Sequence, residues 1–313
     1  MSKQNYQMQD TTFKSGDHML AGNLYLPENF NEEDQYPAVI FSGPFNQVKE
    51  QTGAVYAKHF AEQGYITLVF DHAGYGDSEG TIRNFEQPFI KMEGIRDGIS
   101  YLGTLPYIDA EKLYGLGVYA SGGYMPIVAT TDKRLKAVAT VSGMMDNEGG
   151  VFDVMSKEEV LPILIEANKA RQKQYETGEV EYNDGLGYSL MTEEQIDALD
   201  KTSARYEGYD FYMTERAGSQ TYPNYTYNVP SNLMEYTPLT SALKIAGHLY
   251  TPYLGVIGEL ATDTGPLTEK FFEATTEPKK LLVVPNATHV SLYDNDEHVQ
   301  QAVGEMIDFF GEY

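Results

Sequence analysis

A short apolar run that breaks into small residues at 113–124 is the segment with the clearest chemical meaning. It reads Leu-Tyr-Gly-Leu-Gly-Val-Tyr-Ala-Ser-Gly-Gly-Tyr, which predicts a buried strand that turns abruptly into a helix. Such a turn, a nucleophile elbow, projects one strained residue and needs small residues two positions before and after it. Centred on Tyr119, the flanking residues Gly117 and Ser121 are both small. Centred on Ser121, one flanking residue is bulky, so the spacing favours Tyr119 as the apex and the chemistry favours Ser121 as the nucleophile.

Two later stretches supply the imidazole and the carboxylate that a hydroxyl nucleophile needs. The imidazole takes the hydroxyl proton, and the carboxylate holds the imidazole in the correct tautomer. His289 follows the last predicted strand, and Glu259 and Asp263 follow the strand before it. The order nucleophile, acid, histidine is one that hydrolytic triads use. We predict Ser121 as the nucleophile, His289 as the base, and either Glu259 or Asp263 as the acid. Tyr119 is the weaker nucleophile, because a phenol has a pKa near 10.

A triad of this kind also needs two backbone N–H groups that stabilise the oxyanion of the tetrahedral intermediate. One is the amide that follows the apex, which is Ala120 or Gly122 according to which residue holds that position. The other is expected in the loop after an earlier strand, at Phe45 or Asn46. The sequence leaves both pairs of alternatives open.

Strand-like apolar runs alternate with helical stretches over most of the chain. Strands are predicted at 19–26, 37–42, 65–70, 113–118, 136–141, 252–258 and 280–285, and helices at 51–63, 89–103, from 125 onward and at 296–310. Several of these strands are apolar on both faces, as a parallel sheet requires, and the β-α-β order implies right-handed crossovers. Ligands bind beyond the carboxyl ends of such strands, which is where the candidate residues lie.

The alternation stops near Asp146 and resumes after about Ile245. Ser156 and Thr192 each begin a capping-box pattern, which predicts two helices in this interval. A tyrosine-rich stretch follows. We therefore predict an inserted helical cap at 146–245, with the core formed by residues 1–145 and 246–313. The aromatic side chains of this cap are expected to form a small core or a dimer face rather than a ligand cage.

The net charge and the lack of cysteine exclude several classes of binding partner and cofactor. The formal charge of −24 disfavours nucleic acid and anionic membrane surfaces, since both would be repelled. The chain has no cysteine, which excludes disulfides, thiolate catalysis and Cys-ligated zinc, and the histidines outside the candidate site show no metal-ligand spacing. The first ten residues contain no apolar stretch and no run of 18 apolar residues occurs, so we expect neither a signal peptide nor a membrane-spanning segment. We expect a cytoplasmic protein without a metal.

Five segments resemble bacterial α/β-hydrolases of the dienelactone-hydrolase-like group, which are related to X-prolyl-peptidase-type acyl hydrolases. They are 21–27, 48–52, 70–80, 116–124 and 286–294. The resemblance implies an α/β-hydrolase fold, which we expect as a mostly parallel eight-stranded sheet flanked by helices. It also implies cleavage of a small ester, lactone or amide through an acyl-enzyme, with no cofactor.

Two positions depart from the family pattern. Relatives usually carry Cys or Ser where this chain has Tyr119, and glycines where it has Phe45, Asn46 and Gln47. Both changes place bulk where the family keeps space. The leading hypothesis is an esterase-type hydrolase that uses Ser121. The alternative is a catalytically inactive relative that acts as a small-molecule-binding or interaction protein, and a homodimer is compatible with either.

Overall fold

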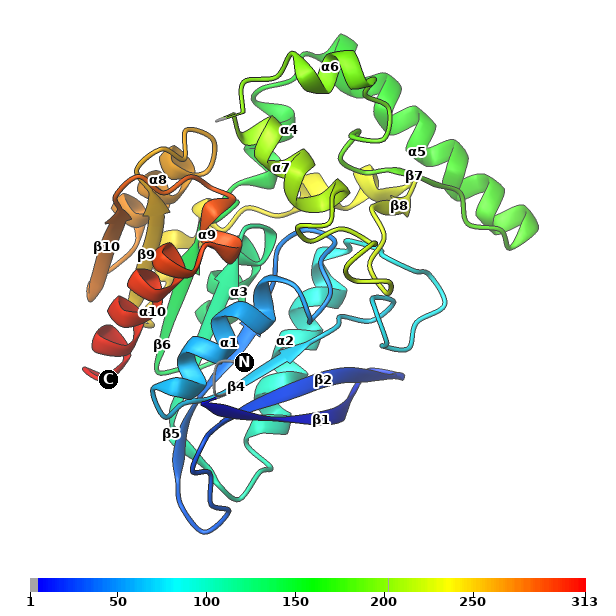
Figure 1. Cartoon of the computed structure of the whole chain (residues 1–313). Coiled ribbons are helices and arrows are strands. Elements are labelled where there is room, and N and C mark those ends of the chain that lie inside the picture. Colours follow the sequence, from blue (N-terminus) through cyan, green and yellow to red (C-terminus); the bar gives the residue numbers. More distant parts are fainter. Residues whose placement is uncertain (1–4, 202) are drawn as a thin grey trace.

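An eight-stranded twisted sheet forms the centre of the structure (Figure 1). The computed structural model describes residues 5–201 and 203–313. The strands of the sheet are β1 (Tyr6–Ser15), β2 (His18–Pro27), β3 (Tyr36–Ser42), β4 (Ile66–Phe70), β5 (Ile108–Val118), β6 (Ala137–Val141), β9 (Tyr253–Gly258) and β10 (Lys279–Val284). Their order across the sheet is β1-β2-β4-β3-β5-β6-β9-β10. Strand β2 is antiparallel to both its neighbours and the pairs from β4 to β10 are parallel, which confirms the predicted mostly parallel sheet.

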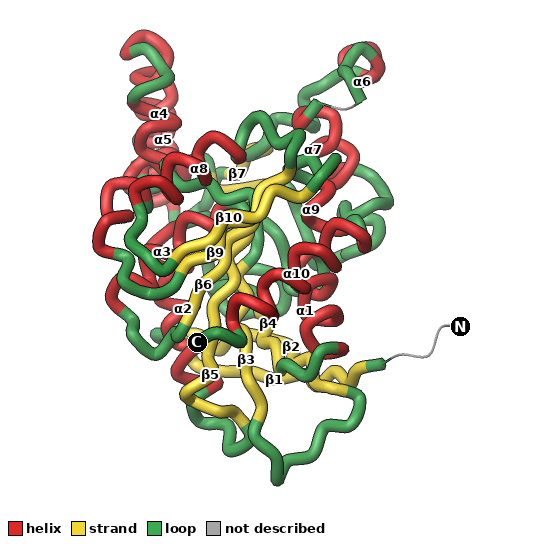
Figure 2. Tube along the Cα trace, turned by 90° about the vertical axis from the view of Figure 1, so that its left-hand side faces the viewer, coloured by secondary structure: helices red, strands yellow, loops and turns green. Residues whose placement is uncertain are grey.

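Helices cover both faces of the sheet (Figure 2). Helices α1 (Thr52–Glu62) and α10 (Asp296–Phe310) lie on one face, and α2 (Pro88–Leu102), α3 (Ala120–Thr131) and α8 (Gly265–Ala274) on the other. Helix α10 packs on the sheet through an apolar stripe. This stripe consists of the buried residues Val299, Val303, Met306 and Phe310, which recur every three or four positions. Strands β4, β6 and β9 are buried along their whole length, so their apolar runs are continuous rather than alternating, whereas the edge strands β1 and β10 keep exposed residues.

Most of residues 147–248, here called the cap segment, lie above the carboxyl ends of the parallel strands (Figure 1), and the last turn of this segment packs against α3 and α8. They form α4 (Asn147–Phe152), α5 (Lys157–Thr177), β7 (Tyr182–Asp184), α6 (Glu193–Asp197), α7 (Ala204–Met213), β8 (Asn228–Pro230) and the 3-10 turns η1 (Leu233–Glu235), η2 (Thr237–Leu239) and η3 (Leu243–His248). The predicted capping boxes at Ser156 and Thr192 are both formed. The cap segment is hydrogen-bonded to the core loops, for example from Gln51 Nε2 to the Ala217 carbonyl at 2.6 Å.

Some elements were not predicted. Strand β1, helix α7 inside the tyrosine-rich stretch, helix α8 and the short pair β7–β8 are absent from the pattern above. Helix α3 begins at Ala120, five residues before the predicted start, because the small residues of the elbow already belong to its first turn. A short helix, α9 (Ser291–Asp294), follows the last strand and was also not predicted. Within the described residues no helix has the length and apolar character needed to cross a bilayer. Residues 1–4 of the stretch searched for a signal peptide lie outside them.

Candidate active site

The turn from β5 to α3 projects Tyr119. This residue has φ 51° and ψ −107°, a conformation that non-glycine residues rarely adopt. A Cβ added to Gly117 would lie 2.2 Å from the carbonyl oxygen of Ser121, and one added to Gly122 would lie 2.6 Å from the Cα of Gly143. Because the backbones of Gly117 and Ser121 approach so closely, the turn requires small residues two positions before and two positions after its apex. The elbow is therefore centred on Tyr119.

Ser121 lies beneath the turn. Its side chain has 0 % exposure, and its Oγ is 2.8 Å from Ser42 Oγ, which in turn is 2.9 Å from His72 Nε2. His289 makes its hydrogen bonds with other residues. The structure thus does not bring Ser121 and His289 together, and the predicted attack by Ser121 has no geometric basis. The spacing of small residues in the sequence indicates the apex, Tyr119, whereas the hydroxyl of Ser121 is buried at the start of α3.

Ser121, Ser42 and His72 form a buried series of hydrogen bonds, here called the structural tie. Burial, and next the charge of Lys91, hold the pKa of His72 well below its ordinary value, so the ring is neutral at pH 7. The structural tie links the first turn of α3, the end of β3 and the loop after β4.

His289 is oriented by Asp263. Its Nδ1 is 2.7 Å from Asp263 Oδ2, whereas Glu259 Oε2 accepts from the backbone amide of Asn286 at 2.8 Å. Burial alone would raise the pKa of Asp263, but the hydrogen bond and charge of His289 and the amide of Thr264 bring it below the ordinary value. Of the two candidate acids, Asp263 is the one at the imidazole, and Glu259 fastens the loop that carries His289.

The other nitrogen of His289 faces a phenol. Nε2 is 2.7 Å from the hydroxyl of Tyr293, a fully buried residue of α9. Burial raises the pKa of Tyr293 well above its usual value, so the phenol is protonated. If Nδ1–H donates to Asp263, Nε2 accepts from Tyr293 O–H, and the basic nitrogen is already engaged. Tyr293 is not among the predicted site residues, although the spacing of four residues places it about one helical turn after His289 (i, i+4).

The phenol of Tyr119 lies against the imidazole without bonding to it. The two ring centroids are 4.8 Å apart, and no hydrogen bond links the Tyr119 hydroxyl to any described residue. Burial, followed by the charge of Asp263 and smaller contributions that include Glu86, raises the pKa of Tyr119. The apex therefore carries a protonated phenol, which can donate a hydrogen bond and is a poor nucleophile.

Two backbone amides remain for a ligand oxygen. The Asn46 amide donates to Glu86 Oε2 at 3.2 Å, and the Gly122 amide donates to the Tyr119 carbonyl at 2.9 Å. Among the described residues, the amides of Phe45 and Ala120 have no partner. Of the four predicted oxyanion donors, these two are the ones that are left available.

A buried carboxylate holds the loop that presents Phe45. Glu86 receives hydrogen bonds from Lys91 Nζ (2.6 Å), the Tyr75 hydroxyl (2.9 Å) and the Asn46 amide. Asn46 has φ 56°, so this bond maintains a strained backbone. A fourth donor is the hydroxyl of Tyr124 in α3, at 3.4 Å from Glu86 Oε1. No motif in the sequence marks Glu86, because its partners come from separate segments.

The cap segment contributes further phenols and a carboxylate. The hydroxyl of Tyr212 accepts from Gln47 Nε2 at 3.2 Å, and its ring stacks on Tyr225 with centroids 6.1 Å apart. Glu207 Oε1 accepts from the hydroxyl of Thr288, the residue before His289, at 2.9 Å. Burial raises the pKa of Glu207, and its Oε2 is buried without a partner. The site is therefore rich in phenols and acidic.

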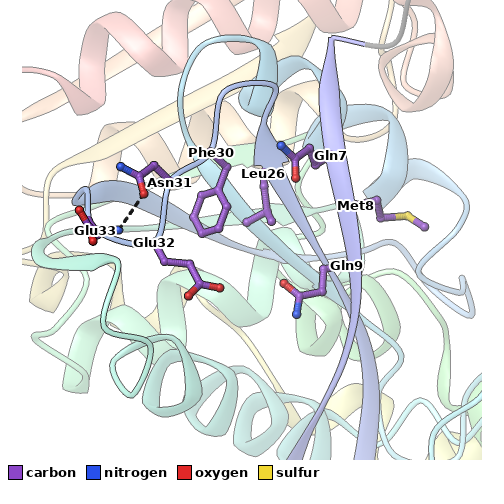
Figure 3. A pocket seen from close by; sticks show the side chains of 8 residues that line it. All are labelled: Gln7, Met8, Gln9, Leu26, Phe30, Asn31, Glu32 and Glu33. Atoms are coloured by element: carbon purple, nitrogen blue, oxygen red, sulfur yellow. Dashed lines mark hydrogen bonds between the residues drawn. The ribbon is translucent and has the colours of Figure 1, made fainter.

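Other hollows and clusters lack this chemistry. A surface hollow beside β1 and β2, lined by residues such as Gln7, Leu26, Phe30 and Glu32, holds no pair of nucleophile and base (Figure 3). The carboxylates of Glu50, Asp71 and Asp77 surround the ammonium of Lys49, which takes the position that a metal cation would occupy.

Comparison with known proteins identifies the family and agrees with the fold. Residues 16–222 match the family described as X-Pro dipeptidyl-peptidase (S15 family). The chain belongs to this family. It is 30 % identical over 300 residues to the uncharacterised protein YcjY of Escherichia coli K12, covering 94 % of each chain. It is 28 % identical over 283 residues to the thiohydrolase aneE of Aspergillus aculeatus, covering 87 % of this chain and 83 % of the relative.

Solved structures show the same architecture. The hypothetical protein PA2218 of Pseudomonas aeruginosa superimposes with a TM-score of 0.83 at 27 % identity, covering 98 % of this chain and 95 % of the other. The α/β hydrolase GrgF of Penicillium gives a TM-score of 0.78 at 21 % identity, with 98 % of each chain covered. The fold is that of the α/β-hydrolases, and the predicted family resemblance is confirmed.

Proposed function

We propose that this protein binds a small carbonyl compound at the elbow and does not form an acyl-enzyme through Ser121. One observation carries the proposal: the residue that the elbow projects is Tyr119, while the hydroxyl of Ser121 is bonded to Ser42 under the turn. An acyl-enzyme needs a nucleophile at the apex and a base within hydrogen-bond reach of it. This chain keeps the base and its acid and replaces the nucleophile, so the inactive-relative hypothesis is the better supported of the two.

The groups around the elbow favour a particular ligand. The free amides of Phe45 and Ala120 can donate to a carbonyl oxygen, and the protonated phenol of Tyr119 supplies a further donor. The carboxylate of Asp263 disfavours a further negative charge nearby, and the whole chain carries −24. We therefore expect a neutral or cationic carbonyl compound to bind better than an anionic one.

A second candidate is hydrolysis by general base catalysis, without an acyl-enzyme. The 2.7 Å hydrogen bond between Asp263 and His289 favours it, because this pair can take a proton from water directly. The route requires Tyr293 to release Nε2 of His289 first.

Binding is tested by titration calorimetry with three esters of similar size: acetylcholine, ethyl butyrate and monoethyl succinate. The proposal expects heat of binding from the cationic and neutral esters and weaker binding of the anionic one. Equal binding of all three, or binding of the succinate ester alone, would contradict the charge argument. The absence of binding by all three would contradict the binding proposal.

Catalysis is tested with p-nitrophenyl acetate and a fluorophosphonate probe on the wild type, Ser121→Ala and His289→Ala. The proposal expects no labelling and no burst of nitrophenol from any of them. Labelling that Ser121→Ala removes would restore the acyl-enzyme mechanism. Turnover without labelling that only His289→Ala abolishes would establish the general base route.

A further inference from the structure

Several groups of an acyl-transfer site are still present around the elbow, although the nucleophile is missing. They are the imidazole of His289 with Asp263 at 2.7 Å, the free amides of Phe45 and Ala120, and the unbonded phenol of Tyr119. A base, an oxyanion site and a proton donor are also the groups that remove a proton from the carbon beside a carbonyl. That reaction requires no covalent bond to the protein.

The two free amides lie on neighbouring turns of the chain. Ser42 ends β3 three residues before Phe45, and it pairs in register with Gly117, two residues before the apex. Its hydroxyl is also 2.8 Å from that of Ser121, in the first turn of α3, so the loop after β3 passes beside the elbow. An enolate carries its negative charge on the former carbonyl oxygen. Amides placed for the oxyanion of a tetrahedral intermediate therefore stabilise an enolate as well.

The phenol of Tyr119 is better suited to this reaction than to nucleophilic attack. Burial raises the pKa of the phenol above its ordinary value, so it is protonated at neutral pH. A protonated phenol can donate a hydrogen bond to the enolate oxygen, whereas a nucleophile must first lose that proton. Its ring lies against the imidazole of His289, with centroids 4.8 Å apart, so a ligand held at the elbow lies next to the base.

Two carboxylates can stabilise the cation that His289 becomes when it accepts a proton. Asp263 is bonded to its Nδ1, and the charge of His289 also acts on Glu207, whose Oε2 is buried without a partner. A carboxylate in contact with an imidazole stabilises the imidazolium that forms during proton transfer. The cation that acts on Glu207, Arg216, is already paired with two aspartates.

Tyr293 occupies the basic nitrogen and must release it first. Its hydroxyl is 2.7 Å from Nε2 of His289. Tyr212 offers a second partner, since a hydrogen bond between the two phenols contributes to the raised pKa of Tyr293. The Tyr293 hydroxyl can therefore turn from the imidazole to Tyr212 and remain hydrogen-bonded. Release of Nε2 then costs at most one hydrogen bond, which is a factor of about five in rate.

From these features we infer that the protein catalyses proton transfer at the α-carbon of a neutral ketone, an isomerase-type reaction that passes through an enolate. Nε2 of His289 takes the proton. The electron pair of the broken C–H bond forms a carbon–carbon double bond, and the carbonyl electrons move onto the oxygen that the amides of Phe45 and Ala120 hold. The imidazolium then returns a proton to the carbon, so the step consumes no co-reactant and oxidises nothing.

A ketone is the expected class of ligand for two reasons. It has no leaving group, so the missing nucleophile is of no consequence. Its α-hydrogens are also more acidic than those of an ester or an amide, because no second heteroatom donates electrons to the carbonyl. The inference rests on the binding of a neutral carbonyl compound that is proposed above.

Deuterium incorporation tests the inference. Phenylacetone is the probe, since it is neutral, has acidic α-hydrogens and carries an aromatic ring that can pack against the phenols of the site. In D₂O, proton NMR should show the α-hydrogens of phenylacetone exchanging about 100-fold faster or more at saturating wild-type protein than in buffer alone. A rate equal to that in buffer would overturn the inference.

Substitutions of the base and of the phenol, each with a matched control, locate the reaction. His289→Gln should lower the protein-dependent exchange rate by about 100-fold or more, and Tyr119→Phe by about 10-fold or more. The controls are His248→Gln and Tyr250→Phe, which remove an imidazole and a phenol from exposed positions and should leave the rate unchanged. An unchanged rate in His289→Gln, or an equal loss in the controls, would contradict the inference.

Tyr293→Phe tests the release of Nε2. It should raise the exchange rate by about five-fold, because the nitrogen no longer has to be freed. A slower rate would count against the inference, since the proton would then pass through the phenol and not directly to the imidazole. If this buried substitution prevents folding, Tyr212→Phe replaces it: loss of the second partner of Tyr293 should slow the exchange, and a faster exchange would count against the inference.

Calorimetry with phenylacetone separates this inference from the proposed function. Binding of phenylacetone without exchange would refute proton transfer and leave the binding of carbonyl compounds standing. No binding of phenylacetone would refute the ketone, while the titrations with the three esters decide the binding proposal independently. Exchange in a ketone cannot arise from an acyl-enzyme, because a ketone has no acyl group to transfer.

Discussion

Replacing the apex phenol should restore chemistry to the elbow. In Tyr119→Cys the thiol takes the projecting position, with φ 51° already imposed by the turn, and faces the imidazole that Asp263 orients. The start of α3 also favours the thiolate, because the helix dipole is positive there. The chain has no other cysteine, so any thiol reactivity belongs to this position.

The expected increase in hydrolysis rate combines the gain from general base assistance by His289 with the cost of breaking its hydrogen bond to Tyr293. General base assistance by a positioned imidazole contributes about 10²- to 10⁴-fold. Against it, the 2.7 Å bond from Tyr293 to Nε2 must break, which costs about 1 kcal/mol, or a factor of about five. The expected gain in ester hydrolysis over the wild type is therefore about 20- to 2,000-fold. Loss of a partly exposed ring should lower the free energy of unfolding by about 1–3 kcal/mol, less than for a fully buried one.

The assay is the initial rate with p-nitrophenyl acetate, together with alkylation by iodoacetamide between pH 6 and pH 9. Tyr119→Ala is the control for the space that the ring leaves. His289→Ala combined with Tyr119→Cys is the control for the imidazole. A Tyr119→Cys variant that folds but hydrolyses the ester no faster than Tyr119→Ala would contradict this prediction, and so would an unchanged rate after removal of His289.

Three further outcomes are expected. Ser121→Ala removes the bond to Ser42, so it should lower the free energy of unfolding by about 1–2 kcal/mol in chemical denaturation and leave ester binding unchanged; a loss of binding with full stability would contradict the structural tie. In the Tyr119→Cys background, Asp263→Asn should reduce the gained hydrolysis rate by about 100-fold or more and Glu259→Gln by less than about three-fold, and the reverse ranking would reassign the acid. Burial raises the pKa of many phenols in the folded state, so the unfolded chain releases their protons first and the free energy of unfolding should fall as the pH rises above about 10. Absorbance at alkaline pH should show those phenols ionising together with unfolding; ionisation of all tyrosines in the folded protein would refute this.

The central strands were predictable because burial on both faces leaves a continuous apolar run. Strand β4 (Ile66–Phe70) and the last helix, α10, match their predicted ranges to within one residue. Strand β1 lies at the edge of the sheet with several exposed residues, so it has no such run. Helix α7 was not predicted, because its tyrosines, although they are spaced as in a helix, cannot be distinguished in the sequence from the tyrosines of the loops around it.

The site was predictable where it depends on position along the chain and not where it depends on contacts between segments. The location of His289 and Asp263 after adjacent strands follows from the β-α order, and the structure joins them. The choice between Phe45 and Asn46 depends on the carboxylate of Glu86, about forty residues away, and no local pattern reports such a bond. Likewise, the burial of Ser121 is decided by Ser42 on the neighbouring strand.

The packing of the elbow explains why its sequence pattern can be present without a nucleophile at the apex. Gly117, Gly122 and Gly123 each approach backbone atoms that a Cβ would strike, so the turn is fixed by packing and not by the apex side chain. The bond from Ser121 to Ser42 then ties the start of the helix to the next strand. A turn that is determined from both sides tolerates a phenol at its strained apex, because none of these contacts involves the ring. The small-residue pattern is thus evidence for the geometry of the turn, and the chemistry must be inferred from the one position that the pattern leaves free, which in this chain is Tyr119.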